Sequence, residues 1–331
     1  MADIHILAVD GGLYSSITAL HDAFFIAELW HRELKKPSAP LFNTRILTMD
    51  GRPVTACGGF TVQPHIAMEE VRDSDYVIVA PLMPHLTDMP GDLDRLREWL
   101  LRMMGRDACV ATICTGSFIL AEMGLLDGRR ATTNWQFARM FRRKYPRVVL
   151  EPEEMLVQDG PLITTGAVTS VYGLILHMIN RIGSPELAAV VSKALLIEGS
   201  RRDQTPYTMF SPIRRHGDEQ VLRAQAFIET EYARIESIDT VAREVGVSPR
   251  HFIRRFKQAT GEPPLKYLQQ VRVQKAKERL ETTADTVEEI TWAVGYRDIS
   301  SFGRLFKQHT RLSPKAYRDK FSLARPAAQS I

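Results

Sequence analysis

The residue best placed for chemistry in this 331-residue chain is a cysteine. Cys114 ends the apolar run 110–113 and precedes the small residues 115–117, which predicts a tight turn from a strand into a helix. A thiol at such a turn lies beside the free N–H groups that begin a helix, and these groups lower a thiol pKa or hold an anion. The spacing is that of a nucleophile elbow with Cys in place of Ser. The alternative is a buried apolar cysteine.

A second set of chemistry-bearing residues is cationic and follows helical spacing. Arg250, Arg254 and Lys257 recur at i, i+4 and i+7, which places them on one face of a helix. Phe252 and Phe256 belong to the opposite face. A helix held by aromatic side chains on one side and presenting arginine on the other fits the major groove of DNA. The alternative is a basic amphipathic helix packed in a soluble bundle.

The cationic helix belongs to a unit that occurs twice, which is the most specific feature of the chain. Residues 241–246 match 290–295 at an offset of 49, and residues 255–260 match 305–310 at an offset of 50. The extra residue falls in the turn between the two blocks. A duplicated helical pair that tolerates one inserted residue in its turn predicts two helix-turn-helix units.

Each copy carries its own start and stop signals. Gly246 and Gly295 are expected to take the left-handed conformation that ends the first helix. Ser248 is the expected N-cap of the second helix in the first copy, and Asp298 or Ser300 in the second. The second copy has the same two faces as the first. Its inward pair is Phe302 and Phe306, and its outward positions are Ser300, Arg304 and Lys307.

Charge is distributed as this interpretation requires. The chain has 43 Lys and Arg against 39 Asp and Glu, for a net charge of +4. Residues 1–217 carry 23 basic against 24 acidic residues, whereas residues 243–320 carry 17 against 9, an excess of 8. A local excess of this kind is the electrostatic footprint of a phosphate-binding surface. Together with the repeat it predicts that double-stranded DNA is the partner.

The elements that must position the cysteine alternate along the first 200 residues. Apolar runs such as 76–80 suit strands buried in a parallel sheet with helices on both faces. The rhythm predicts an α/β domain with a doubly wound, mostly parallel, flavodoxin-like sheet. Strands are expected at 4–9, 44–49, 76–80, 109–114 and 148–150. Helices are expected near 15–34, 91–104, 115–126, 135–144, 169–182 and 185–197.

Beyond residue 198 the pattern changes. Residues 199–217 hold breakers and charges without an apolar stripe and are expected to form a linker arm. The arm separates the α/β domain over 1–198 from an all-α DNA-binding domain over 218–322, and 323–331 form a tail. Helices of the second domain are expected at 218–234, 240–246, 249–260, 264–281, 287–295, 299–310 and 314–320.

Several classes of protein are excluded by composition. The apolar runs stop well short of the ~20 residues that span a bilayer, and no signal-peptide pattern opens the chain. Three cysteines (Cys57, Cys109 and Cys114) are too few for a disulfide framework. We therefore expect a cytoplasmic protein with no membrane partner, and we assign no metal and no cofactor.

Residues 220–320 resemble the DNA-binding domain of the AraC/XylS transcription regulators, in which a long helix joins two helix-turn-helix units. Residues 295–296, 301–307 and 313–318 carry the resemblance, and 271–280 would lie on the joining helix. It implies that Lys257 and Lys307 contact phosphates. Such regulators are more often activators, which would add RNA polymerase as a partner. The implied base-reading residues are Arg250, Ile253, Arg254, Ile299, Ser300, Ser301 and Arg304.

Residues 4–197 resemble the PfpI-type branch of the class I glutamine amidotransferase-like superfamily, on residues 113–117 and 124–135. More narrowly, they resemble regulators that fuse this domain to an AraC-type module. Enzymes of the superfamily need a base beside the nucleophile. Here Thr115 follows the cysteine in place of His, and Asn134 stands where a His often precedes Trp. We therefore expect no catalytic residue. The histidines that remain free to approach are His21, His65, His85 and His177.

We expect the former catalytic pocket to bind a ligand instead, at the carboxyl ends of the strands. Helix-start N–H groups near Thr115 favour a carboxylate and Asp10 favours a cation, which suits a zwitterion such as an amino acid or a quaternary amine. Ser16 takes the place of a catalytic Glu of the resembling enzymes. The residues expected in the pocket are Asp10, Ser15, Ser16, Cys114, Thr115 and Asn134.

The sequence thus predicts a homodimeric, ligand-responsive transcription regulator. One alternative is a cysteine-dependent hydrolase or amidotransferase tethered to DNA. Another is a redox sensor that uses Cys114, which needs a partner thiol. Neither Cys57 nor Cys109 is evidently placed for that role.

Overall fold

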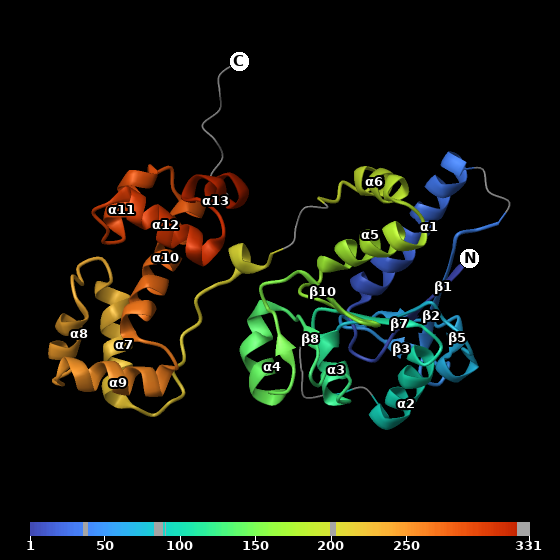
Figure 1. Cartoon of the computed structure of the whole chain (residues 1–331), viewed down its shortest axis with the longest axis horizontal. Coiled ribbons are helices and arrows are strands. Elements are labelled where there is room, and N and C mark those ends of the chain that lie inside the picture. Colours follow the sequence, from blue (N-terminus) through green and yellow to red (C-terminus); the bar gives the residue numbers. More distant parts are fainter. Residues whose placement is uncertain (36–38, 83–88, 90, 199–202, 323–331) are drawn as a thin grey trace, which may run out of the picture. The chain divides into compact units, whose positions relative to one another are not determined.

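A computed structural model of the chain describes residues 1–35, 39–82, 89, 91–198 and 203–322 (Figure 1). It divides into two compact units, Met1–Gln204 and Thr205–Ile331. The boundary falls inside the segment expected as an arm, whose residues 199–202 lie outside the described residues, as does the expected tail 323–331. Within the described ranges, every helix is too short or too polar to cross a membrane.

The first unit is built on a seven-stranded sheet in the order β10-β11-β7-β6-β1-β2-β5. Neighbouring strands run parallel except at β10–β11, which confirms the predicted mostly parallel sheet. The central strand β6 is buried at all four positions because helices cover both of its faces. The strands are β1 (Ala2–Leu7), β2 (Phe42–Thr48), β5 (Ile66–Ala67), β6 (Tyr76–Val79), β7 (Cys109–Ile113), β10 (Leu156–Asp159) and β11 (Leu162–Thr165).

Helices cover the sheet on both faces and make two separate cores, as a doubly wound domain requires (Figure 1). One core packs Trp99 and Phe118 against one face. The other packs Phe24 and Met178 against the opposite face. The helices of the first core are α2 (Leu93–Met104), α3 (Gly116–Glu122) and α4 (Ala138–Lys144). Those of the second are α1 (Tyr14–Lys35), α5 (Ser170–Ile182) and α6 (Pro185–Ala194).

One strand prediction was wrong in its place in the sheet. The strand expected at 148–150 exists as β9 (Val149–Leu150), but it pairs with β8 (Arg130–Ala131) in a separate small sheet. One edge of the main sheet is formed by the β10–β11 hairpin, which the sequence analysis missed. Its turn contains Asp159-Gly160, with Gly160 at φ +60°, and Asp-Gly between two apolar runs is a hairpin signal.

The second unit consists of helices whose lengths repeat. The turn between α8 and α9 spans 245–248, and the turn between α11 and α12 spans 294–298, one residue longer. Helices α8 and α11 have 7 residues each, and α9 and α12 have 12 each, which confirms the two helix-turn-helix units. The helices are α7 (Glu219–Glu231), α8 (Ile238–Glu244), α9 (Pro249–Thr260), α10 (Pro264–Thr282), α11 (Val287–Ala293), α12 (Ile299–Thr310) and α13 (Pro314–Phe321).

Each unit of the repeat closes on a buried tyrosine. Tyr267 donates its hydroxyl to Glu229 at 2.5 Å and packs edge-on against Phe256. Tyr317 repeats the arrangement, donating to Glu281 of α10 at 2.6 Å. Because α10 carries Tyr267, which closes the first helix-turn-helix unit, and Glu281, which accepts from the tyrosine of the second, this one helix packs into both. Figure 1 shows α10 running from the α9 end of this unit to the α12 end.

A buried arginine on α10 fixes the two helix-turn-helix units to each other. Arg272 is 8% exposed and donates to the carbonyl oxygens of Tyr232 at 2.9 Å and Ile235 at 2.7 Å. These carbonyls lie at the end of α7 and in the loop that leads to α8, on the side of the first helix-turn-helix unit. The guanidinium also lies 5.0 Å from the ring centre of Tyr296, in the turn of the second helix-turn-helix unit.

The turn of the second helix-turn-helix makes one further close approach to the first helix-turn-helix. Gly295 adopts φ +85°, the left-handed conformation expected for it, and Gly246 does so at +71°. A Cβ built on Gly295 would lie 2.4 Å from the carbonyl oxygen of Ala233, so only glycine lets the two helix-turn-helix units approach at this point.

We predict that Arg272→Lys destabilises α10 by roughly 1–3 kcal/mol, because an ammonium cannot reach both carbonyls and stack on the tyrosine. Hydrogen exchange of the α10 amides in the full chain measures this loss. Arg297→Lys is the matched control, since the Arg297–Glu236 pair has side chains 92% and 81% exposed and should change stability by less than about 0.5 kcal/mol. Equal protection in the two variants would contradict the locking role of Arg272.

Candidate functional site

The outer face of α9 is free to meet a ligand. Arg250, Arg254 and Lys257 are exposed, and within the described residues no hydrogen bond or ion pair engages their side chains. On the inner face Phe252 and Phe256 are at most 1% exposed and fix the helix to the core, as predicted. An arginine without a protein partner keeps all five of its donors available.

The neighbouring arginine shows the contrast. Arg255 donates to Asp218 at 2.5 Å and also to Gln220, both at the start of α7. Its guanidinium is therefore committed to holding α9 against α7. Two adjacent arginines of α9 therefore have different roles. Arg254 faces solvent, and Arg255 fixes α9 to α7.

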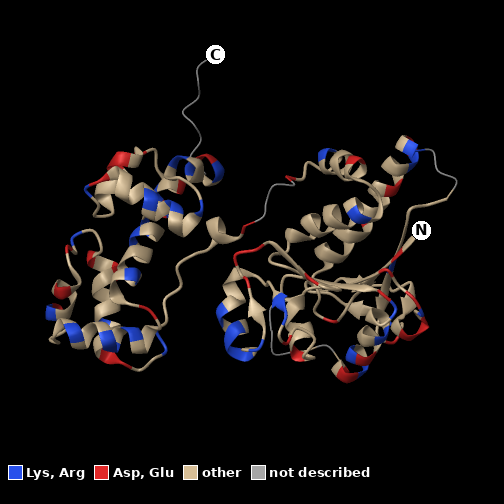
Figure 2. Ribbon diagram, in the orientation of Figure 1, with Lys and Arg blue, Asp and Glu red and all other residues tan. Residues whose placement is uncertain are grey.

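The outer face of α12 repeats that of α9 with smaller side chains. Ser300, Ser301, Arg304 and Lys307 are all exposed. Arg304 donates to the Ser301 hydroxyl at 3.0 Å, which keeps the guanidinium beside the start of the helix. Figure 2 shows lysines and arginines over α9 and α10 of this unit.

Two isoleucines stand out among these polar residues. Ile253 is 43% exposed and Ile299 is 42% exposed, each on the outward side of its helix. Exposed apolar side chains between arginines and serines suit contact with the methyl groups of thymine. All nine predicted DNA-contact residues therefore reach solvent.

The helix caps differ in part from the expectation. Asp298 is the N-cap of α12 and accepts a hydrogen bond from the Ser301 N–H at 2.7 Å, so Ser300 is free of that task. Ser248 is the N-cap residue of α9, as predicted, but its hydroxyl does not make the capping hydrogen bond expected of it. Proline at the first position of α9 has no N–H to satisfy and fixes φ for the helix, so the helix start needs less capping.

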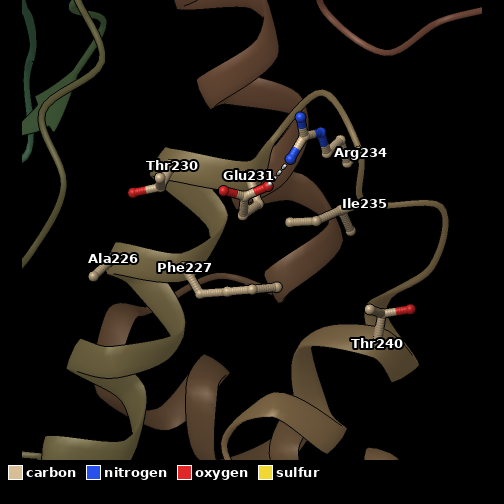
Figure 3. Close-up of a pocket in the computed structure, with 7 residues that line it drawn as sticks. All are labelled: Ala226, Phe227, Thr230, Glu231, Arg234, Ile235 and Thr240. Carbon is tan, nitrogen blue, oxygen red and sulfur yellow. Dashed lines mark hydrogen bonds and ion pairs between the residues drawn. The ribbon is translucent and has the colours of Figure 1, made fainter.

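A shallow depression of about 530 Å³ opens between α7 and α8 (Figure 3). Phe227 and Ile235 give it an apolar lining. Glu231 and Arg234 pair at 3.4 Å, so the charged groups at this site neutralise each other. Its lining includes none of the nine predicted contact residues, and it lacks the unpaired cations that a phosphate needs.

The first residues of the second unit are bonded along α10. Lys277 is 5% exposed and donates to the carbonyl oxygens of Pro206 at 3.4 Å and Thr208 at 2.7 Å. Further on, the Phe210 N–H donates to Gln274 at 3.2 Å. Burial lowers the pKa of Lys277 to about 8, although nearby Glu281 favours the charged form. The sequence analysis missed this residue, because its spacing does not separate it from the exposed lysines of the same helix.

In the first unit Cys114 lies at a strained turn, as the sequence predicts. It has φ +52°, joins β7 to α3 and is 1% exposed. Burial raises the pKa of the Cys114 thiol, and hydrogen bonds from Thr115 and from the Asn134 side chain offset part of the rise. Thr115 is itself fully buried and donates to the carbonyl oxygen of Leu82 at 2.6 Å. The structure therefore brings Cys114, Thr115 and Asn134 together.

The other predicted pocket residues have different surroundings. Asp10 accepts from the Thr55 N–H at 2.9 Å and so holds the end of β3 (Val54–Thr55), which pairs with β4 (Thr61–Val62). Ser15 is exposed in the first turn of α1. Ser16 is 1% exposed, and its hydroxyl has no hydrogen-bond partner among the described residues.

The histidines considered as bases make contacts of their own. His177 lies 3.2 Å from Gln158, and His65 accepts from the Ile46 N–H at 2.9 Å and stacks on His21. His85 lies outside the described residues. Searched over the described ranges, the chain shows no group of three His, Cys, Asp or Glu side chains that would hold a metal ion.

Gln204 is a functional candidate that sequence reasoning missed. Its side chain is 1% exposed and donates to the carbonyl oxygens of Thr133 at 2.9 Å and Pro152 at 3.0 Å. The Thr133 hydroxyl in turn donates to the carbonyl oxygen of Cys114 at 3.2 Å. A hydrogen-bonded path thus joins the cysteine turn to the last residue of the first unit. A signal was present in Gly166, where a Cβ would lie 2.0 Å from the Gln204 amide nitrogen.

Comparison with known families agrees with both halves of this picture. Residues 241–320 match a helix-turn-helix domain, and residues 35–181 match the DJ-1/PfpI family. Among curated proteins, the chain is similar to the HTH-type transcriptional regulator CdhR of Pseudomonas aeruginosa, with 30% identity over 88% of this chain and 85% of that protein. It is also similar to the HTH-type transcriptional regulator GlxA of Rhizobium meliloti, with 29% identity over 84% and 86%.

The fold has a counterpart among solved structures. A candidate transcriptional regulator of Vibrio parahaemolyticus superposes with a TM-score of 0.51 and 21% identity, over 59% of this chain and 98% of that one. At this identity the similarity shows the fold alone.

The buried lysine gives a pH prediction. Because the pKa of Lys277 is about 8 in the fold and about 10.5 when unfolded, the folded state loses its proton first, and stability rises with pH between these values. Urea denaturation should therefore show the difference between the native protein and Lys277→Met growing in favour of the native protein from about pH 8 to about pH 10. Lys275→Met, on the same helix, removes a lysine whose pKa is raised by its hydrogen bond to Glu278, and should show no such gain. A flat difference for Lys277→Met would contradict its burial as a cation.

Proposed function

This chain belongs to the AraC-type helix-turn-helix transcriptional regulators that carry a DJ-1/PfpI domain, and from this premise we propose how its two units divide the work. The second unit reads DNA sequence through the outward faces of α9 and α12. The first unit senses a small metabolite and does not catalyse a reaction. The observation that carries the proposal is the pair of outward faces, fixed to one connector by Arg272.

The residues proposed to contact DNA fall into two groups. The base-reading residues are those near the starts of α9 and α12, because the start of a recognition helix enters the major groove. Lys257 and Lys307 lie about two turns from the starts of their helices, and we assign them to phosphates. The base-reading group is Arg250, Ile253, Arg254, Ile299, Ser300, Ser301 and Arg304.

The sensing pocket is proposed at the cysteine turn. The enclosed thiol with a raised pKa, and neighbours Thr115 and Asn134 that cannot act as a base, support binding over catalysis. The buried hydroxyl of Ser16, which has no partner among the residues that the structure describes, offers a group for a ligand to satisfy. We also assign Asp10 and Ser15 to the pocket, because they lie close to Ser16 in the sequence. The ligand that we propose for it is a zwitterionic metabolite.

The assembly and its setting are proposed as well. We assign a homodimer, since helix-turn-helix proteins that dimerise bind paired half-sites. The exposed side chains of Phe25 (61%) and Leu29 (49%) on one face of α1 support a second copy as the partner of that face. We expect an activator that contacts RNA polymerase in the cytoplasm, where the DNA lies.

We predict that Arg254→Ala weakens binding to the selected operator by about 1–3 kcal/mol and relaxes the preference at one base pair. Lys257→Ala should weaken binding to all sequences alike, with a loss that shrinks at high salt. Fluorescence anisotropy with the operator, its single-base variants and random DNA measures both. Arg234→Ala is the matched control, since its side chain is 86% exposed and paired with Glu231. Equal loss on random DNA for Arg254→Ala would refute the base-reading role.

Cysteine reactivity separates sensing from catalysis. Cys57 is exposed, whereas Cys114 is buried with a raised pKa, so iodoacetamide at neutral pH should alkylate Cys57 well before Cys114. Peptide mass spectrometry follows both sites in one sample, with Cys57 as the internal control. Rapid alkylation of Cys114 would instead favour a cysteine-dependent hydrolase or amidotransferase.

A further inference from the structure

A large groove on the first unit lies apart from the cysteine turn. Its walls are α5, α6 and the start of β10, and it encloses about 870 Å³, within the range of small-molecule sites. Gly173 of α5 faces open space, since a Cβ there would meet nothing within 4 Å. Ala188 and Ala189 of α6 also leave room for an occupant.

The charges of the groove have one sign. Among the described residues that line it, the charged groups are Glu154 and Glu198, and lysine and arginine are absent. Both carboxyl groups are exposed and unpaired within the described part of the chain. His177 adds no positive charge, because burial and then Arg181 lower its pKa.

The remaining lining suits the body of an organic cation. The ring nitrogen Nε2 of His177 lies 3.2 Å from the Gln158 side-chain oxygen, and if it donates there, Nδ1 remains as an acceptor. Tyr172 also lines the groove and is 36% exposed, and an aromatic ring is a group that can bind a cation over its face. Leu176 and Leu195 supply apolar surface for an aliphatic chain.

We propose that the α5–α6 groove is a binding site for an organic amine in its cationic form, with an aliphatic body. The site is separate from the cysteine turn. It rests on the proposed function in one respect, that the first unit responds to ligands.

The groove is built from the backbone that anchors the end of the first unit. The Glu154 carbonyl oxygen accepts from the Gln204 amide at 3.0 Å, and Glu154 forms a β-bridge with Asp203. The Gln204 N–H donates to the Glu153 carbonyl at 2.6 Å. An amine held by the Glu154 carboxylate therefore bears directly on the segment that leads into the DNA-binding unit.

Calorimetry on the full-length protein without DNA tests the site. Putrescine is the probe, and succinate, an anion of similar length, is the charge control. Putrescine should bind, and the Glu154→Gln/Glu198→Gln double variant should weaken its binding by roughly tenfold or more. Glu153→Gln is the matched control, because this neighbouring exposed carboxylate does not line the groove.

A second variant tests the groove by shape instead of charge. Gly173→Leu fills the open space on α5 and replaces a helical glycine with a better helix former, so it should fold and yet fail to bind putrescine. Binding that survives in both groove variants, preference for succinate, or no heat with putrescine at millimolar concentration would each overturn the proposal. These outcomes are independent of DNA, so they are distinct from a failure of Arg254→Ala to alter sequence preference.

Discussion

The architecture of the DNA-binding unit depends on one buried cation. Arg272 carries its charge into the interior, where its cost is offset by two backbone carbonyls and the face of an aromatic ring. The carbonyls come from one helix-turn-helix unit and the ring from the other. A straight connector alone would fix the distance between α9 and α12, but their mutual rotation also needs contacts of this kind on both sides. Two helices that must enter the same duplex require both quantities to be set.

Arginine takes three different roles in this unit, and sequence alone does not separate them. Arg254 faces solvent and has no partner in the described part of the chain, Arg255 holds Asp218, and Arg272 is buried. Helical spacing placed Arg254 correctly because its face is defined by the phenylalanines opposite. No local pattern marked Arg272, since its partners lie 40 and 37 residues away along the chain. Local periodicity determines which face a residue lies on, and tertiary contacts determine what it does there.

The same distinction explains how much of the fold could be predicted. The bounds of α9 and α12 were predicted to the residue, because proline or a cap marks each start and a left-handed residue (Gly261 or Arg311) follows each end. The β10–β11 hairpin was missed although Asp159-Gly160 marks its turn, because its four-residue strands mix polar residues with apolar ones, whereas the equally short β6 is apolar throughout. At the cysteine turn, spacing predicted the tight strand-to-helix backbone, and the resemblance to the PfpI-type branch pointed to Thr115 and Asn134 as neighbours of the thiol. Neither predicted that Asp10 accepts a hydrogen bond from Thr55 of β3, because that contact joins residues 45 apart.

The residues on either side of the boundary between the units are each hydrogen-bonded within their own unit. Gln204 is bonded within the first unit, and Pro206 offers its carbonyl to Lys277 within the second, so Thr205 alone separates two anchored residues. Consecutive Cα atoms are about 3.8 Å apart, and a single residue cannot absorb a displacement larger than a few ångströms. A change in the bonds of Gln204 must therefore be taken up by the backbone rotations at this junction or by the hydrogen bonds that Pro206 and Thr208 make to α10. Since α10 also carries Arg272, such a shift would reach the helix that sets the two recognition helices. Coupling by this route requires only that the ligand favour one arrangement of the junction over another.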